Sequence, residues 1–195
     1  MKNSKKVLLA FLIIIIVVFL IIFFKGAADS SGVTDATEAD ETSLVAKEMS
    51  YLKDTEKLYV VKEFSFKKDR NIEYEQNFIG DSKGFNTWYG AETFLEKENQ
   101  KGLFYGRDKV LAYPVEVGKT WNIESFTFTI ESVNKTIEIP AGTFTNVVEV
   151  KTTEKGVEGY STTYFAKGVG QILRESVDAN SEKTIRFEIL EIKDK

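Results

Sequence analysis

Apolar and polar residues alternate along most of the chain, over residues 58–192. The alternation is cleanest at residues 126–130, 137–139 and 185–189. Successive side chains of a β-strand point to opposite faces, so a period of two predicts strands with one buried and one solvated face. Such strands are typical of antiparallel sheets. The pattern therefore predicts an all-β domain.

Turn-forming sequences divide this pattern into short strands. The turns are expected at residues 81–84, 99–102, 154–156 and 178–181. The expected strands cover residues 58–66, 72–79, 85–95, 102–106, 109–113, 120–133, 135–139, 145–153, 161–165, 171–177 and 184–192. Strands do not alternate with helices, which argues against a parallel α/β fold. We expect a curved antiparallel sheet, forming a half-open barrel or a sandwich, preceded by one N-terminal transmembrane helix.

The predicted transmembrane helix is an apolar run without charges at residues 7–24. Its length of about 27 Å matches the hydrocarbon core of a bilayer. Three lysines precede the run and one follows it, which predicts a cytoplasmic N-terminus and places residues 26–195 outside. Cleavage of a signal peptide before Asp29 is the alternative, because small residues precede this position. The run is longer than a usual signal-peptide core, which favours a retained anchor.

The chain is predicted to have three parts. Residues 1–25 hold the cytoplasmic lysines and the anchor, and residues 26–43 are small, polar and acidic, which is typical of a solvated linker. Residues 44–195 form the β-domain. A short helix is expected at its start, because four apolar residues have helical spacing: Leu44, Val45, Met49 and Leu52.

The composition limits the compartment and the partners. The chain has no Cys, which excludes disulfides, thiol chemistry and an acylated lipoprotein N-terminus. An extracytoplasmic domain without disulfides fits a bacterial surface better than a eukaryotic secreted protein. The net charge of −4 argues against nucleic acid as a partner, because its binding needs a concentrated basic face.

The chain offers few residues for catalysis. It has neither His nor Cys, which removes the Ser-His-Asp triad, thiol nucleophiles and most zinc sites. Gly168 and Gly170 lack the other residues of a phosphate-binding loop. We therefore predict no catalytic, cofactor-binding or metal-binding residues and no cofactor. Paired carboxylates are the one remaining enzyme chemistry. The acids in question fall where solvated strand faces place them: Glu73, Glu75, Glu131, Glu138, Glu149 and Glu188.

Aromatic residues are the other candidates for a site. Five of them define a possible apolar ligand face: Phe78, Trp88, Phe94, Phe104 and Tyr113. Such residues ordinarily fill a core or pair across strands. The alternative is an apolar concave surface on a curved sheet, on which a lipid or a peptide binds.

Three segments in the second half of the chain carry a family resemblance: residues 114–121 (PVEVGKTW), 139–148 (IPAGTFTNVV) and 164–172 (YFAKGVGQI). Their elements PxxxGKxW, PAGTF and YxAxGVG, in this order, resemble an uncharacterised class of bacterial exported and lipoprotein-type β-domains. The resemblance covers about residues 110–176. It implies an extracytoplasmic location and a curved sheet similar to that of lipoprotein carriers, and it supplies no activity.

The same segments have structural roles on physical grounds. Pro140 cannot donate to a strand ladder and should end a strand. Gly142 can take a positive φ in the connection that follows, and Phe144 should then pack inward. The glycines of residues 166–170 permit a sharp bend between two strands. Trp121 is expected to cover one end of the core.

Together, these observations predict a single-pass bacterial membrane protein with a non-enzymatic extracytoplasmic β-domain. That domain would bind an envelope component, another protein or an apolar ligand. Two alternatives stay open: a cell-wall or glycan-directed enzyme with paired carboxylates, and a purely structural or assembly module.

Overall fold

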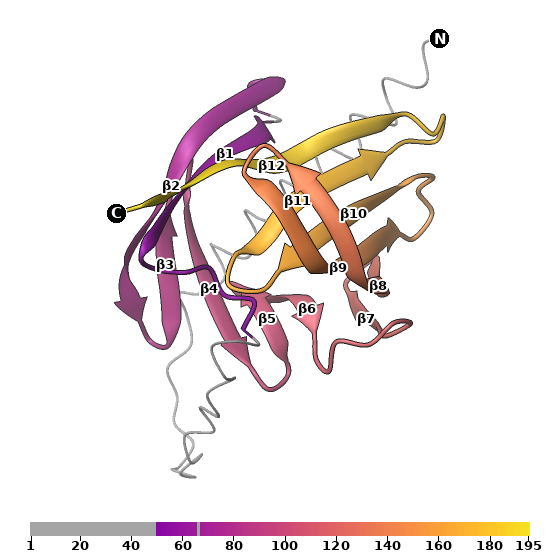
Figure 1. Ribbon diagram of the computed structural model, residues 1–195. Coiled ribbons are helices and arrows are strands. Elements are labelled where there is room, and N and C mark those ends of the chain that lie inside the picture. The colour runs from indigo at the N-terminus through magenta and orange to yellow at the C-terminus, as the bar shows by residue number, and fades with distance from the viewer. Residues whose placement is uncertain (1–49, 66) are drawn as a thin grey trace, which may run out of the picture. The chain divides into compact units, whose positions relative to one another are not determined.

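The alternating segments form one twelve-stranded antiparallel sheet, which confirms the all-β prediction (Figure 1). The computed structural model describes residues 50–65 and 67–195. No helix long and apolar enough to cross a membrane occurs among these residues. The predicted anchor, the predicted linker and residues 44–49 of the predicted short helix lie outside the described residues. Residues 50–52 of that predicted helix are not helical.

The strands follow each other with short connections. They are β1 (Lys57–Ser65), β2 (Arg70–Ser82), β3 (Phe85–Tyr89), β4 (Thr93–Asn99), β5 (Gly102–Tyr105), β6 (Asp108–Ala112), β7 (Thr120–Ile123), β8 (Phe126–Ile139), β9 (Gly142–Glu154), β10 (Tyr160–Ala166), β11 (Gly170–Val177) and β12 (Lys183–Asp194).

The sheet is a meander in two halves that meet where β1 pairs with β12. The strand order is β6-β5-β4-β3-β2-β1-β12-β11-β10-β9-β8-β7. The two edge strands, β6 and β7, are therefore consecutive in the chain. The indole Nε1 of Trp121 in β7 donates a hydrogen bond of 2.8 Å to the carbonyl oxygen of Lys109 in β6. The sheet curls into a nearly closed barrel shape (Figure 1), so the sandwich alternative was wrong.

Three predicted strand boundaries were also wrong. The predicted strand at residues 120–133 is divided by a turn at Glu124 and Ser125, which separates β7 from β8. Residues 85–95 form two strands, β3 and β4, because the chain turns at Gly90, whose N–H donates to the carbonyl oxygen of Glu92. A Cβ atom at Gly90 would lie 2.7 Å from the ring of Tyr74, so a larger residue there would require this ring to move. The predicted break at residue 134 is absent. Strand β8 continues through it, with register shifts against β9 near Ser132 and Lys135.

The core consists of two apolar clusters. One includes Tyr59, Val61, Trp88, Phe187 and Ile189. The other includes Tyr51, Leu103, Leu111, Ile130 and Phe165. Their fully buried side chains supply most of the driving force for folding, at about 25 cal/mol for each Å² of apolar surface removed from water.

The predicted roles of the motif residues are largely confirmed. Strand β8 ends at Ile139, directly before Pro140. Gly142 has a φ of 131°, and the connection from β10 to β11 contains Gly168 and Gly170 at φ values of 70° and 73°. Phe144 and Trp121 are half-buried, packed against the first and the second cluster. They therefore lie at the margin of the core.

Candidate functional site

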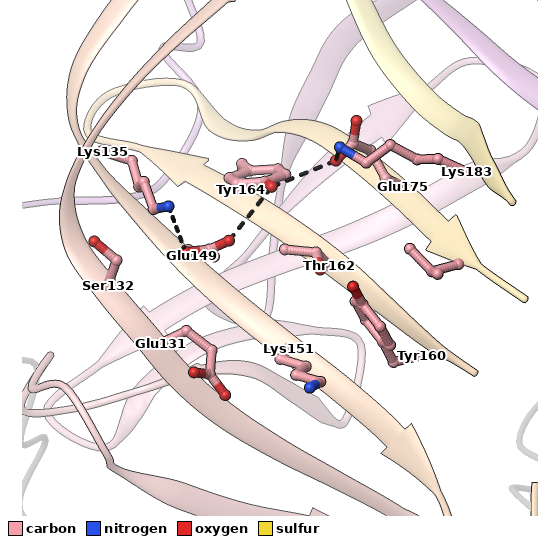
Figure 2. Close-up of a pocket in the computed structure, with 11 residues that line it drawn as sticks. Glu131, Ser132, Lys135, Glu149, Lys151, Tyr160, Thr162, Tyr164, Glu175 and Lys183 are labelled. Atoms are coloured by element: carbon pink, nitrogen blue, oxygen red, sulfur yellow. Dashed lines mark hydrogen bonds and ion pairs between the residues drawn. The ribbon is translucent and has the colours of Figure 1, made fainter. Parts of the chain in front are cut away.

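A polar groove lies on the second half of the sheet, over strands β8 to β12 (Figure 2). Its volume is about 560 Å³. Three lysines and three glutamates line it, together with two tyrosines and small polar residues. The full lining is Glu131, Ser132, Lys135, Glu149, Lys151, Tyr160, Thr162, Tyr164, Glu175, Val177 and Lys183.

The floor of the groove is a chain of polar contacts in which five successive strands each contribute one side chain (Figure 2). Strand pairing places these side chains on one face, because directly paired residues of antiparallel strands share a face. Tyr164 in β10 pairs with Glu149 in β9, and Val177 in β11 pairs with Lys183 in β12. The chain of contacts runs Lys135, Glu149, Tyr164, Glu175, Lys183.

The distances in this series of contacts show that Glu149 and Glu175 each have a lysine partner. Lys135 Nζ lies 3.3 Å from Glu149 Oε2, and Lys183 Nζ lies 2.6 Å from Glu175 Oε2. The hydroxyl of Tyr164 lies 3.4 Å from an oxygen of each glutamate. Burial and the two neighbouring carboxylates, Glu175 before Glu149, raise the pKa of Tyr164, which keeps it a neutral donor. The floor is thus charge-compensated from within.

One end of the groove keeps charged groups that this chain of contacts does not use. The ammonium of Lys151 lies 4.4 Å from the ring centroid of Tyr160. Among the described residues, Lys151 forms no ion pair with a carboxylate, and Glu131 forms none with an ammonium group. Glu131 is exposed. A ligand that reaches this end meets a cation on an aromatic face and a carboxylate on the neighbouring strand, β8.

The sequence indicated this groove only in part. Glu131, Glu138, Glu73 and Glu75 are exposed, as the alternation predicts. Glu149 is only 18% exposed in its side chain, because it lies in the groove between Lys135 and Tyr164. The roles of Tyr164, Glu175 and the lysines were missed, although their positions on one strand face could have grouped them.

The five aromatic residues of the predicted ligand face do not lie together. Phe78, Trp88 and Phe94 belong to the first cluster, in which Trp88 is fully buried. The Trp88 ring lies 5.7 Å from that of Phe78 and 6.3 Å from that of Phe94. A ligand would reach this ring only if the side chains around it moved.

The two remaining aromatic residues lie elsewhere. Tyr113 packs against the second cluster, and its hydroxyl donates a hydrogen bond to Glu98. Phe104 lies on the face opposite to its neighbours Leu103 and Tyr105, where it lines a hollow of about 260 Å³. Phe85 and Lys97 share that hollow, and the ammonium of Lys97 lies 5.3 Å from the Phe85 ring centroid.

Metal-ligand geometry is also absent from the described part of the chain. No three Asp or Glu side chains of residues 50–65 and 67–195 converge in a way that could hold a metal ion.

Comparison with known proteins gives structural similarities alone. No protein-family model and no curated protein matches the sequence. One similar structure is a proposed exported protein with a YmcC-like fold from Bacteroides fragilis, at 10% identity and a TM-score of 0.43, covering 72% of this chain and 97% of that one. Another is a proposed lipoprotein from Parabacteroides distasonis, at 13% identity and a TM-score of 0.39, covering 74% of this chain and 98% of that one.

Proposed function

We propose that the protein is a membrane-anchored, extracytoplasmic binding module of a bacterial envelope and that it is not an enzyme. The polar groove over β8 to β12 is its binding site. Its ligand is a polar envelope component that carries both positive and negative groups, such as a peptide-bearing glycan fragment. The location is inferred from the apolar run at residues 7–24 and the lysines that precede it.

The observation that carries this proposal is the composition of the groove. Its three lysines and three glutamates balance, so it has no excess charge of either sign. Lys151 on the Tyr160 ring and the exposed Glu131 are available to a ligand, whereas the other four charged side chains form ion pairs with each other. Cation–aromatic contacts and hydrogen bonds to charged groups give such a surface its specificity.

The geometry favours a polar ligand over an apolar one in this groove. The predicted aromatic face would need Trp88, which is buried among other rings. Apolar ligands are ordinarily held in concave sites lined mostly by hydrophobic side chains. The lining of the groove includes one aliphatic residue, Val177.

Binding of soluble muropeptides to the full-length protein in nanodiscs tests the proposal. We expect saturable binding, weakened about tenfold or more by Lys151→Ala, because a hydrogen bond to a charged group contributes about 1.5–3 kcal/mol. Lys155→Ala is the matched control, since Lys155 is exposed in the turn after β9 and does not line the groove. Equal weakening by both variants, or no binding by the wild type, would contradict the proposed site.

The enzyme alternative has one observation in its favour, the two carboxylates that share the Tyr164 hydroxyl. It is separated from binding by measuring muropeptide hydrolysis with Glu149→Gln and Glu175→Gln. We expect no hydrolysis by any form of the protein. Hydrolysis by the wild type that either variant abolishes, with its melting temperature unchanged, would replace the binding module by a carboxylate enzyme.

A further inference from the structure

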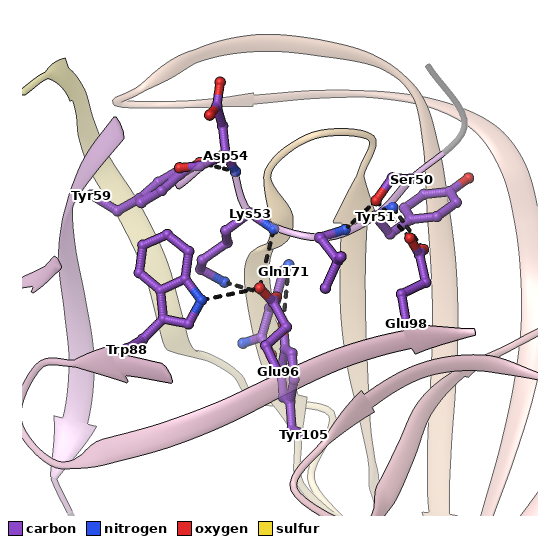
Figure 3. A network of polar contacts seen from close by, with 11 residues as sticks. Ser50, Tyr51, Lys53, Asp54, Tyr59, Trp88, Glu96, Glu98, Tyr105 and Gln171 are labelled. Atoms are coloured by element: carbon purple, nitrogen blue, oxygen red, sulfur yellow. Dashed lines mark hydrogen bonds and ion pairs between the residues drawn. The ribbon is translucent and has the colours of Figure 1, made fainter. Parts of the chain in front are cut away.

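The segment before β1, residues 50–54, crosses the inside of the curved sheet as a strap (Figure 3). Its backbone is bound to the turn between β10 and β11: the N–H of Gly168 donates to the Ser50 carbonyl oxygen at 2.8 Å, and the N–H of Asp54 donates to the Gly168 carbonyl oxygen at 3.0 Å. On the other side it is bound to β4, where the N–H of Tyr51 donates to Glu98 at 2.9 Å. The strap is not one of the twelve strands.

The strap inserts a lysine into a fully enclosed cage. Lys53 is 4% exposed, and its ammonium lies 5.6–5.9 Å from the ring centroids of Phe94, Tyr105 and Tyr59. Glu96, which is 0% exposed, forms the negative end of the cage. The indole Nε1 of Trp88 donates to Glu96 Oε2 at 3.2 Å and orients this carboxylate (Figure 3).

The fit between the lysine and the cage is incomplete. The ammonium stays 4.0 Å from Glu96 Oε1, at the outer limit of an ion pair, and that oxygen is buried without a hydrogen-bond partner. Charge-assisted hydrogen bonds between an ammonium and a carboxylate are about 2.7–2.9 Å long. A buried acceptor without a donor is destabilising, because it has lost its hydrogen bonds to water without replacement. An ammonium that reached further into the cage would supply the missing hydrogen bond.

The strap lies outside the strand ladder, so its departure would leave the twelve-strand pairing intact while withdrawing Tyr51 from the second cluster. It lies at the N-terminal end of the β-domain, before the first strand pair, and it closely approaches the β10–β11 turn at Gly170. A Cβ atom at Gly170 would lie 3.2 Å from the Tyr51 carbonyl oxygen and 3.3 Å from both Lys53 Nζ and Glu96 Oε1. The turn is therefore shaped around the strap, whereas the cage is made by strands β1, β3, β4 and β5.

We propose that the cage formed by Glu96, Trp88, Tyr59, Phe94 and Tyr105 is a recognition site for a primary alkylammonium group, which residues 50–54 occupy in cis through Lys53. A ligand that presents a primary alkylammonium group displaces the strap and takes this position. The site is distinct from the polar groove and does not depend on the function proposed for it.

Chemical complementation of a truncated lysine tests the chemistry of the cage. The full-length Lys53→Ala protein lacks three methylenes and an ammonium, which is the shape of n-propylammonium. At about ten times its dissociation constant, n-propylammonium should raise the Tm of this variant by roughly 3 °C. The neutral analogue 1-propanol should not. Lys53→Met is the matched control, because its side chain refills the cage and should leave no room for the amine.

Hydrogen exchange of the wild-type protein tests displacement without any substitution. Ligand at ten times its dissociation constant raises the population of the open strap about elevenfold if it binds only that state. The amides of Tyr51, Lys53 and Asp54 should therefore exchange about tenfold faster in n-propylammonium chloride than in sodium chloride of the same ionic strength. Amides within the strand ladders should be unchanged.

Two results would overturn the proposal. Equal stabilisation of Lys53→Ala by 1-propanol and by n-propylammonium would show an apolar hole without selectivity for an ammonium. Strap amides that exchange equally in both salts would show that Lys53 is a fixed structural residue, even if the variant fails to fold.

Discussion

Lys53 and Glu96 are the two residues whose surroundings differ most from those of ordinary charged side chains. Burial lowers the pKa of Lys53, and the neighbouring Glu96 opposes this effect. Burial raises the pKa of Glu96, opposed by Lys53 and by the hydrogen bonds from the Lys53 N–H and the Trp88 indole. Each partner makes the burial of the other tolerable. Removing one of them alone would leave a buried charge uncompensated.

This pair should leave a signature in the pH dependence of stability. The pKa of Glu96 in the folded state lies above its value in the unfolded chain. Above about pH 4.3 the folded protein therefore binds more protons than the unfolded chain does. Stability that is present below this pH is therefore lost as the pH rises toward the folded pKa. The free energy of unfolding of the wild type, minus that of the Lys53→Met/Glu96→Gln double variant, should decrease from pH 4 to pH 7.

Urea unfolding at half-unit pH steps measures this difference. The double variant is the control because it keeps the volume of both side chains and removes both titrating groups. Parallel pH profiles of the two proteins would contradict a raised pKa of Glu96.

At the scale of the strands, a single glycine decides whether β5 can lie beside β6. Gly102, the first residue of β5, has a φ of 145°, and a Cβ atom there would lie 2.1 Å from the carbonyl oxygen of Leu111. We expect Gly102→Ala to lower the free energy of unfolding by about 3 kcal/mol or more, because the backbone of β6 must move. Gly106→Ala is the matched control. Gly106 also has a positive φ, of 60°, but nothing lies within 4 Å of its added Cβ.

The control should lower the free energy of unfolding by about 1–2 kcal/mol, the usual cost of the left-handed conformation. Chemical denaturation of both variants measures the difference between strain alone and strain with a clash. Equal losses would show that β6 adjusts freely to a side chain at position 102.

The strands also differ in how far the sequence predicts them. Alternation identified most strands because burial of one face imposes a period of two. The turn at Gly90 was missed, and the side chain packed against this glycine, Tyr74, comes from another strand. The bend of β8 at Ser132 and Lys135 depends on its register against β9. Lys53 was not recognised at all, because lysine is almost never fully buried and its aromatic partners come from β1, β4 and β5.

At the scale of the whole molecule, the middle and the ends of the β-domain occupy different positions in the meander. Its middle supplies both edges of the sheet, β6 and β7, whereas its first and last strands pair with each other. The polar groove uses strands of the second half, and the lysine cage uses strands of the first half. The strap connects the cage to the chain that leads to the predicted anchor.

The topology of the intact chain gives the last prediction. The charge-free run at residues 7–24 and the preceding lysines predict that the full-length protein stays in the membrane fraction with its β-domain outside. Residues 26–43 contain Glu38 and Glu41 but no Lys or Arg. A protease that cleaves after glutamate, added to intact spheroplasts, should therefore release a fragment that begins near Thr42. Trypsin should not cut this segment, and a cytoplasmic protein should stay intact as the control. A soluble protein that begins at Asp29 without added protease would show signal cleavage, and release only after lysis would show the opposite orientation.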